Sequence, residues 1–150
     1  MKKVCADAGF IIALWDERDP YHLQAARHYR DYFQDKENCL LLPWPILYES
    51  VRTRTVKNRS TMLALERDWR LLERQRRLEL LDDHPYRDSA VRECFEEVAR
   101  SREHYRPLSL ADRVIRGMLA DPNLRIDLFI TFNQGDFSDI CRTTRRKMLS

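Results

Sequence analysis

The sequence contains little glycine and no long apolar run. Only 3 of its 150 residues are glycine, which argues against a turn-rich β protein and favours long helices. The longest uncharged apolar stretches, such as residues 39–46, are much shorter than the about 20 residues that a membrane-spanning helix needs, and they contain proline. We therefore expect no association with a membrane.

Cysteine is sparse as well. The four cysteines lie at positions 5, 39, 94 and 141, and no two of them have the Cys-x-x-Cys spacing of a zinc site. Cys5, Cys39 and Cys94 stand among apolar residues, so we expect ordinary thiols in a core. No signal-peptide pattern opens the sequence, and we expect a cytoplasmic protein.

The composition is that of a folded protein with a charged surface. Apolar residues make up 43% of the chain and charged residues 34%. A chain of 150 residues can bury a core, and no linker or repeat divides this one, so we expect one domain over residues 1–150. The net charge of +3 is too small to indicate nucleic-acid binding, which leaves the distribution of basic residues to decide.

Short apolar runs alternate with longer amphipathic segments. The apolar runs predict strands at 3–6, 39–42, 78–81 and 128–131. The amphipathic segments predict helices at 9–15, 21–34, 46–53 and 60–76, another that begins at 88 after a turn, and a last one from 109 to just before Pro122. This alternation indicates an α/β fold with a largely parallel sheet.

Acidic and amide side chains follow several of the predicted strands. Asp7 ends the first strand, Glu49 lies one turn into the helix after the second, and Asp112 lies in the first turn of a later helix, while Asn133 and Asp136 follow the last strand. The carboxyl ends of parallel strands share one edge of a sheet, where ligand sites collect. A cluster of acids without basic partners indicates a hard cation with oxygen ligands, namely Mg²⁺ or Mn²⁺.

Each acid also has a structural interpretation. Asp7 can cap the following helix through the amides of Gly9 and Phe10. Ser109 and Asp112 have the spacing of a capping box, in which the acid reaches back to the Ser109 amide. Glu49 can be a solvated helix residue, and Asp136 can close a turn, so no single acid establishes the site.

Taken together, four motifs resemble the PIN-domain family in order and spacing. They are Asp7 with GFIIALWDERDPYH after it, ILYES around Glu49, SLADRVIRGMLA around Asp112, and ITFNQGDF with Asn133 and Asp136. The resemblance implies one PIN-like domain with four or five sheet strands flanked by helices. It implies a Mg²⁺- or Mn²⁺-dependent endoribonuclease with catalytic and metal-binding residues Asp7, Glu49 and Asp112, and further metal contacts from Asn133 and Asp136.

The chain's size resembles that of the single-domain VapC-type toxins of the PIN-domain family. This likeness implies an antitoxin as a protein partner and a homodimer. The chain departs from the family pattern at two positions. Gly9 stands where the family often has Ser or Thr, which removes a supporting hydroxyl near Asp7. Asn133 stands at the fourth acidic position and brings no charge, so we expect a second metal ion to bind more weakly there.

Basic residues are concentrated directly after Glu49. The run RTRTVKNR contains Arg52, Arg54, Lys57 and Arg59 and no acid, and we expect these four residues to contact the RNA phosphate backbone. The tail RTTRRKMLS has the same character and is either a second phosphate contact or a solvated surface. Tyr48 can stack on an unpaired base, whereas we expect Trp15 and Trp44 to pack in the core.

Two other classes of function stay open. A PIN-like module that binds RNA or protein without cutting is the main alternative, favoured by Gly9 and Asn133. A phosphatase of the haloacid dehalogenase type requires an acid at position 9, and a nucleotide enzyme requires a glycine-rich phosphate loop that this sequence lacks.

Overall fold

Five strands and eight α-helices make up the chain in a computed structural model that describes residues 1 to 150. The strands are β1 (Lys3–Ala6), β2 (Cys39–Pro43), β3 (Leu78–Leu81), β4 (Leu128–Ile130) and β5 (Lys147–Leu149). The helices are α1 (Ala8–Trp15), α2 (His22–Tyr29), α3 (Trp44–Ser50), α4 (Thr53–Val56), α5 (Arg59–Arg74), α6 (His84–Val98), α7 (Leu110–Ala120) and α8 (Gln134–Thr143). A π-helical segment, η1 (Arg30–Gln34), continues α2, and a 3-10 turn, η2 (Arg102–His104), lies between α6 and α7.

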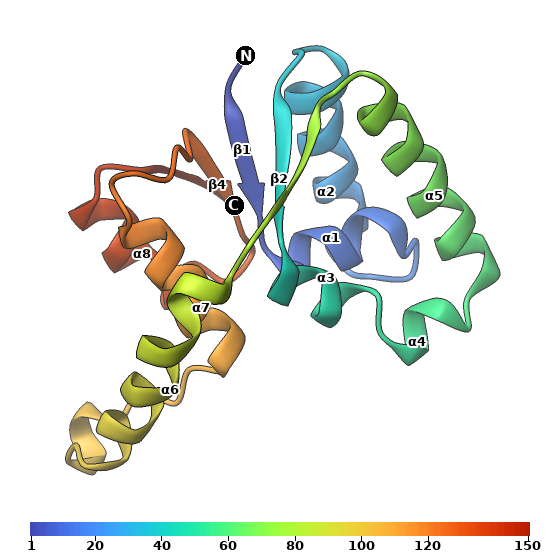
Figure 1. The fold of residues 1–150 in the computed structure, drawn as a ribbon. Helices are drawn as coiled ribbons and strands as arrows, with labels where there is room; N and C mark the ends of the chain where they lie inside the picture. Colours follow the sequence, from blue (N-terminus) through green and yellow to red (C-terminus); the bar gives the residue numbers. More distant parts are fainter.

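The strands form one fully parallel sheet in the order β3-β2-β1-β4-β5. The chain moves from β1 to β2 to β3 in one direction and then returns to the other side of β1. Because crossovers between parallel strands are right-handed, this reversal places the helices of the two halves on opposite faces. Figure 1 shows α1, α2 and α5 on one side of the sheet and α6, α7 and α8 on the other. In open parallel sheets, ligands bind outside the carboxyl ends of the strands at such a reversal, which here lies between β1 and β4.

The central strands are buried on both faces, as expected for a parallel sheet covered by helices. All three residues of β4 are buried, as are Val4, Cys5 and Ala6 of β1. Helix α8 is held to this core by Phe137, whose ring packs edge-on against Phe129 with the ring centroids 5.0 Å apart. The loops that follow β1 and β4 therefore start from a rigid base.

The predicted α/β class with a largely parallel sheet is confirmed, and the fifth strand, β5, completes the sheet. The predicted turn at residues 82–88 is wrong, because α6 already begins at His84. Pro85 lies in the first turn of this helix, where a backbone amide would have no hydrogen-bond partner within the helix, so proline is tolerated there. The predicted helix at 46–53 is also displaced, since α3 begins at Trp44. Pro45 is tolerated in its first turn as Pro85 is in α6.

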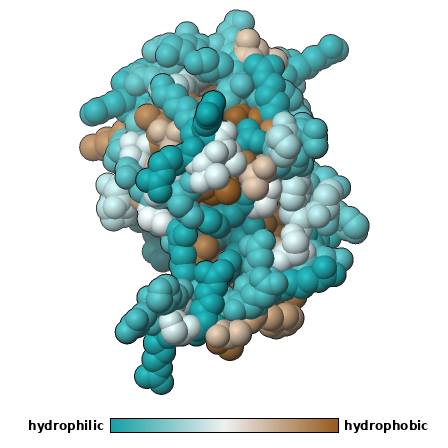
Figure 2. Space-filling model, turned by 90° about the vertical axis from the view of Figure 1, so that its left-hand side faces the viewer, coloured by the Kyte–Doolittle hydropathy of each residue, from teal (hydrophilic) through white to brown (hydrophobic).

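The face that α6, α7 and α8 cover is mostly hydrophilic, with small scattered apolar areas (Figure 2). None of the helices combines the length and the hydrophobicity of a membrane-spanning segment. Cys5, Cys39 and Cys141 are buried free thiols, and Cys94 is half-buried.

Candidate active site

Asp7 lies where β1 ends and α1 begins, beside the reversal in strand order between β1 and β4. Its amide continues the sheet ladder by donating to the carbonyl of Ile130 at 2.9 Å. Its carboxylate accepts two hydrogen bonds, from the amide of Ala8 at 2.7 Å and from the hydroxyl of Thr131 at 2.8 Å. Asp7 thus caps α1, through Ala8 and not through Gly9 and Phe10 as the sequence suggested. The carboxylate is 7% exposed and fixed in orientation.

Glu49 and Asp112 reach the same edge of the sheet from two helices that contact each other, α3 and α7. Both side chains are half-buried, and neither carboxylate forms an ion pair. Ser109 caps α7 by accepting a hydrogen bond from the Asp112 amide at 3.1 Å. The Asp112 amide therefore takes part in the helix cap, while its carboxylate lies in the region of the other acids.

The electrostatics show that these acids share one region. Burial raises the pKa of Asp7, and the charges of Asp112 and Asp136 raise it further, against hydrogen bonds from Thr131 and Ala8. Burial also raises the pKa of Glu49, with Asp112 and Asp7 adding to the rise. The pKa of Asp112 is raised by burial and by Asp136. The charges of neighbouring acids thus raise the pKa of Asp7, Glu49 and Asp112, against smaller opposing effects of Arg52 on Glu49 and of Arg116 on Asp112.

Asn133 and Asp136 lie at the N-terminus of α8, which follows β4. The side-chain amide of Asn133 donates to the carboxylate of Asp136. Arg116, one turn beyond Asp112 on α7, donates to the Asp136 carbonyl at 2.6 Å and binds Asp139 through two hydrogen bonds of 2.8 Å each. The guanidinium of Arg116 lowers the pKa of Asp139 strongly. Arg116 therefore anchors the start of α8 and leaves the Asp136 carboxylate free of an ion pair.

The donor types fit a hard divalent cation. Asp7, Glu49 and Asp112 supply only carboxylate oxygens, which are the ligands that Mg²⁺ and Mn²⁺ prefer. Their mutual repulsion and partial burial are the conditions that a bound cation relieves. No group of three or more His, Cys, Asp or Glu side chains is arranged in this structure so that it could hold a metal ion. Binding would therefore require rotation of these side chains toward one another.

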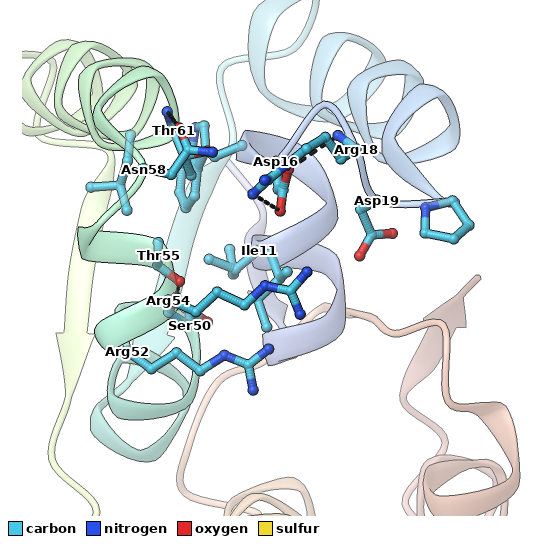
Figure 3. A pocket seen from close by; sticks show the side chains of 14 residues that line it. Ile11, Asp16, Arg18, Asp19, Ser50, Arg52, Arg54, Thr55, Asn58 and Thr61 are labelled. Carbon is cyan, nitrogen blue, oxygen red and sulfur yellow. Dashed lines mark hydrogen bonds and ion pairs between the residues drawn. The ribbon is translucent and has the colours of Figure 1, made fainter.

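The predicted RNA-contacting residues do not line one common pocket. All four are exposed and form no side-chain hydrogen bond or ion pair. Arg52 and Arg54 line a pocket beside α1 (Figure 3), whereas Arg59 lines an apolar groove formed by α3, α5 and β3. Lys57 lines neither.

The aromatic residues and the tail differ in part from the predictions. Trp15 is buried as predicted, but Trp44 is 40% exposed beside Tyr48, with the two ring centroids 6.0 Å apart. In the tail, Arg146 donates hydrogen bonds to four carbonyl groups around the end of α7 and the start of β4. This part of the tail stabilises the fold.

Sequence reasoning missed the roles of Thr131 and Arg116. Thr131 is fully buried, donates to Asp7 and accepts a hydrogen bond from the Asn133 amide at 3.0 Å. It supplies a hydroxyl to Asp7 from the residue that follows β4. The available signals were a threonine directly after a buried strand and an arginine four residues after Asp112, on the same face of the helix.

The sequence matches no protein-family model and no curated protein. Two solved structures have a similar fold. VapC20 of Mycobacterium tuberculosis, a toxin that cleaves the sarcin–ricin loop, superposes with a TM-score of 0.59 at 16% identity, over 91% of this chain and 94% of VapC20. VapBC2 of Rickettsia felis, bound to a DNA fragment from its promoter, gives a TM-score of 0.56 at 12% identity, over 98% of this chain and 97% of its own. The chain therefore has the PIN-domain fold of VapC toxins, as the sequence resemblance predicted.

Proposed function

We propose that the chain is a divalent-metal-dependent endoribonuclease that acts in the cytoplasm as a single domain. The observation that carries this proposal is the group of half-buried or buried carboxylates, Asp7, Glu49 and Asp112, which have raised pKa values and form no ion pair at the carboxyl edge of a VapC-like fold. Buried carboxylates that repel one another destabilise a folded protein unless a bound cation neutralises their charge.

Each acidic residue would have its own role in binding the metal ion. Asp7, oriented by Ala8 and Thr131, would be the fixed ligand, and Glu49 and Asp112 would complete the set, with Asn133 and Asp136 at its edge. A divalent cation supplies an activated water and stabilises the charge that develops on the phosphoryl oxygens. Arg52 would hold the RNA backbone next to Glu49, where its positive charge partly opposes the rise in the pKa of that acid.

Cleavage of RNA tests this function. A mixture of structured and single-stranded RNA should be cut in the presence of Mn²⁺ or Mg²⁺, and EDTA should stop the reaction. Asp7→Asn should abolish cleavage while the protein stays folded, because asparagine is as good a helix cap as aspartate. Asp88→Asn is the matched control, since Asp88 is exposed and unpaired on α6. Undiminished cutting by Asp7→Asn would exclude the proposed role of Asp7.

We further propose the biological setting of a toxin, with an antitoxin as partner, RNA as substrate and a homodimer as the working form. The likeness to VapC20 and VapBC2 supports this proposal through the fold. Sedimentation equilibrium of the purified chain tests the dimer, and a monomer at micromolar concentration would contradict it.

A PIN-like module that binds RNA or protein without cutting is the second candidate. It is favoured by the absence of a ready three-residue metal cluster and by the uncharged Asn133. The two candidates differ in their response to Mn²⁺. A ligand that binds only the folded state raises the melting temperature with its concentration, and the non-catalytic module predicts no change.

A further inference from the structure

A pocket of about 240 Å³ lies beside the candidate site, between the end of α1, the loop after it, α4 and the start of α5. Figure 3 shows its lining side chains, which include apolar, basic, acidic and neutral polar residues. Ile11, Ile12 and Leu65 provide apolar surface, and three arginines, Arg18, Arg52 and Arg54, provide positive charge.

The three arginines are not equivalent. Arg18 donates two hydrogen bonds to Asp16, at 3.0 Å and 3.3 Å, so its charge is already matched. Arg52 and Arg54 form no side-chain hydrogen bond and no ion pair with any residue. Figure 3 shows their two side chains extended in the same direction across α1. Two guanidinium groups that extend in the same direction and form no ion pair suit a phosphate, whose oxygens accept paired hydrogen bonds from arginine.

The pocket adjoins the acids. Ser50, which follows Glu49 directly in α3, is one of its lining residues. Arg52 follows Glu49 by three residues, and Arg54 lines the pocket together with Asp16. A phosphate bound by these two arginines would therefore lie on the RNA strand near the bond at the acidic site.

The lining also suits a base. A nucleobase has apolar faces and a polar edge, and the pocket offers the apolar side chains of α1 and α5 next to Asp19 and Asn58. The Asn58 oxygen caps α5 through the Thr61 amide at 3.1 Å, while its side-chain nitrogen has no partner. Bases in an A-form duplex are stacked and paired, whereas unpaired bases can be turned outward into a protein pocket.

On the basis of the proposed nuclease function, we propose that this pocket binds one unpaired nucleotide of the RNA, with its phosphate on Arg52 and Arg54. The pocket nucleotide would lie on the RNA strand next to the cleaved bond. Fully paired RNA cannot fill the pocket.

Fluorescence anisotropy in EDTA, where no cleavage occurs, tests the pocket. The wild-type protein, the double variant Arg52→Ala/Arg54→Ala and the control Arg27→Ala/Arg74→Ala are titrated with a single-stranded RNA and with its fully paired duplex. Arg27 and Arg74 are exposed and unpaired, so the control removes the same charge elsewhere. Melting temperatures confirm that all three proteins are folded.

The wild type and the control should bind the single strand at least about tenfold more tightly than the duplex, and the pocket variant should lose about tenfold in affinity for the single strand. The slope of log affinity against log salt concentration should fall by about 0.7 in the pocket variant, the value for one lost phosphate of a single strand. The control should keep the wild-type slope.

Equal binding of single strand and duplex by the wild type, or equal behaviour of the pocket variant and the control, would overturn the proposal. Cleavage with Mn²⁺, measured in parallel, separates this failure from that of the nuclease. If the wild type cuts RNA but Arg52 and Arg54 do not matter, only the pocket assignment fails. If the wild type never cuts RNA but binds single strands through these arginines, the nuclease function fails and the pocket stands.

Discussion

Replacement of Thr131 by valine removes one hydroxyl from the centre of the candidate site without changing the side-chain shape. Thr131 is fully buried, and its hydroxyl donates to the Asp7 carboxylate at 2.8 Å and accepts from the Asn133 amide at 3.0 Å. A hydrogen bond to a charged group contributes about 1.5–3 kcal/mol, and the Asp7 oxygen that loses it has little access to water. We therefore expect Thr131→Val to lower the free energy of unfolding by about 2–3 kcal/mol at pH 7.

Urea unfolding measures this loss. With a slope of about 2 kcal/mol per M of urea, the midpoint should fall by about 1–1.5 M. Thr53→Val is the control, because Thr53 is exposed without a side-chain hydrogen bond, and it should change stability by less than about 0.5 kcal/mol. In the background of Asp7→Asn the Thr131→Val loss should shrink, since the bond no longer joins a charge. Equal losses in both backgrounds would refute the proposed coupling of Thr131 to Asp7.

Three further perturbations have signs that the structure determines. Burial and neighbouring acids raise the pKa of Asp7 in the folded protein above the ordinary 3.8, so the wild-type protein loses stability as the pH rises from 3.8 through the folded-state pKa. In urea unfolding without metal, the stability of Asp7→Asn relative to wild type should therefore increase over this pH range. A difference that stays constant with pH would contradict this prediction. Arg116→Gln should cost about 2 kcal/mol and speed amide exchange at the start of α8, because Asp139 loses a bidentate partner, whereas Arg142→Gln on the exposed face of α8 should do neither. Gly9→Ala should stabilise the protein by about 0.5–1 kcal/mol in thermal unfolding, since a methyl group there meets open space, and a loss of stability would show that the site needs glycine.

The sheet and the acids on its edge were predictable because they depend on local patterns. Buried strands of apolar residues and amphipathic helices have distinct periodicities, and the carboxyl ends of parallel strands necessarily share an edge. The places of Asp7 after β1 and Asn133 after β4 follow from this rule. The shared region of the acids appears in the structure as their mutual effect on pKa.

The contacts between distant segments were not predictable from one sequence. Thr131 and Asp7 are separated by 124 residues, and only the pairing of β1 with β4 brings the hydroxyl to the carboxylate. Arg146 looked like part of a basic surface, but its side chain satisfies carbonyl groups around the end of α7 and the start of β4. A charged residue reveals such a structural role only when the backbone around it is known.

Titration with Mn²⁺ while the melting temperature is followed tests the central claim most directly, namely that Asp7, Glu49 and Asp112 bind one divalent ion together. At a free concentration 100 times the dissociation constant, binding stabilises the wild type by about 2.7 kcal/mol, which for a chain of this length raises the melting temperature by about 5–10 °C. Asp7→Asn and Asp112→Asn should lose most of this rise, and Asp88→Asn should keep it. A melting temperature of the wild type that stays constant up to millimolar Mn²⁺, or an equal rise in all four proteins, would contradict the metal site and with it the proposed nuclease.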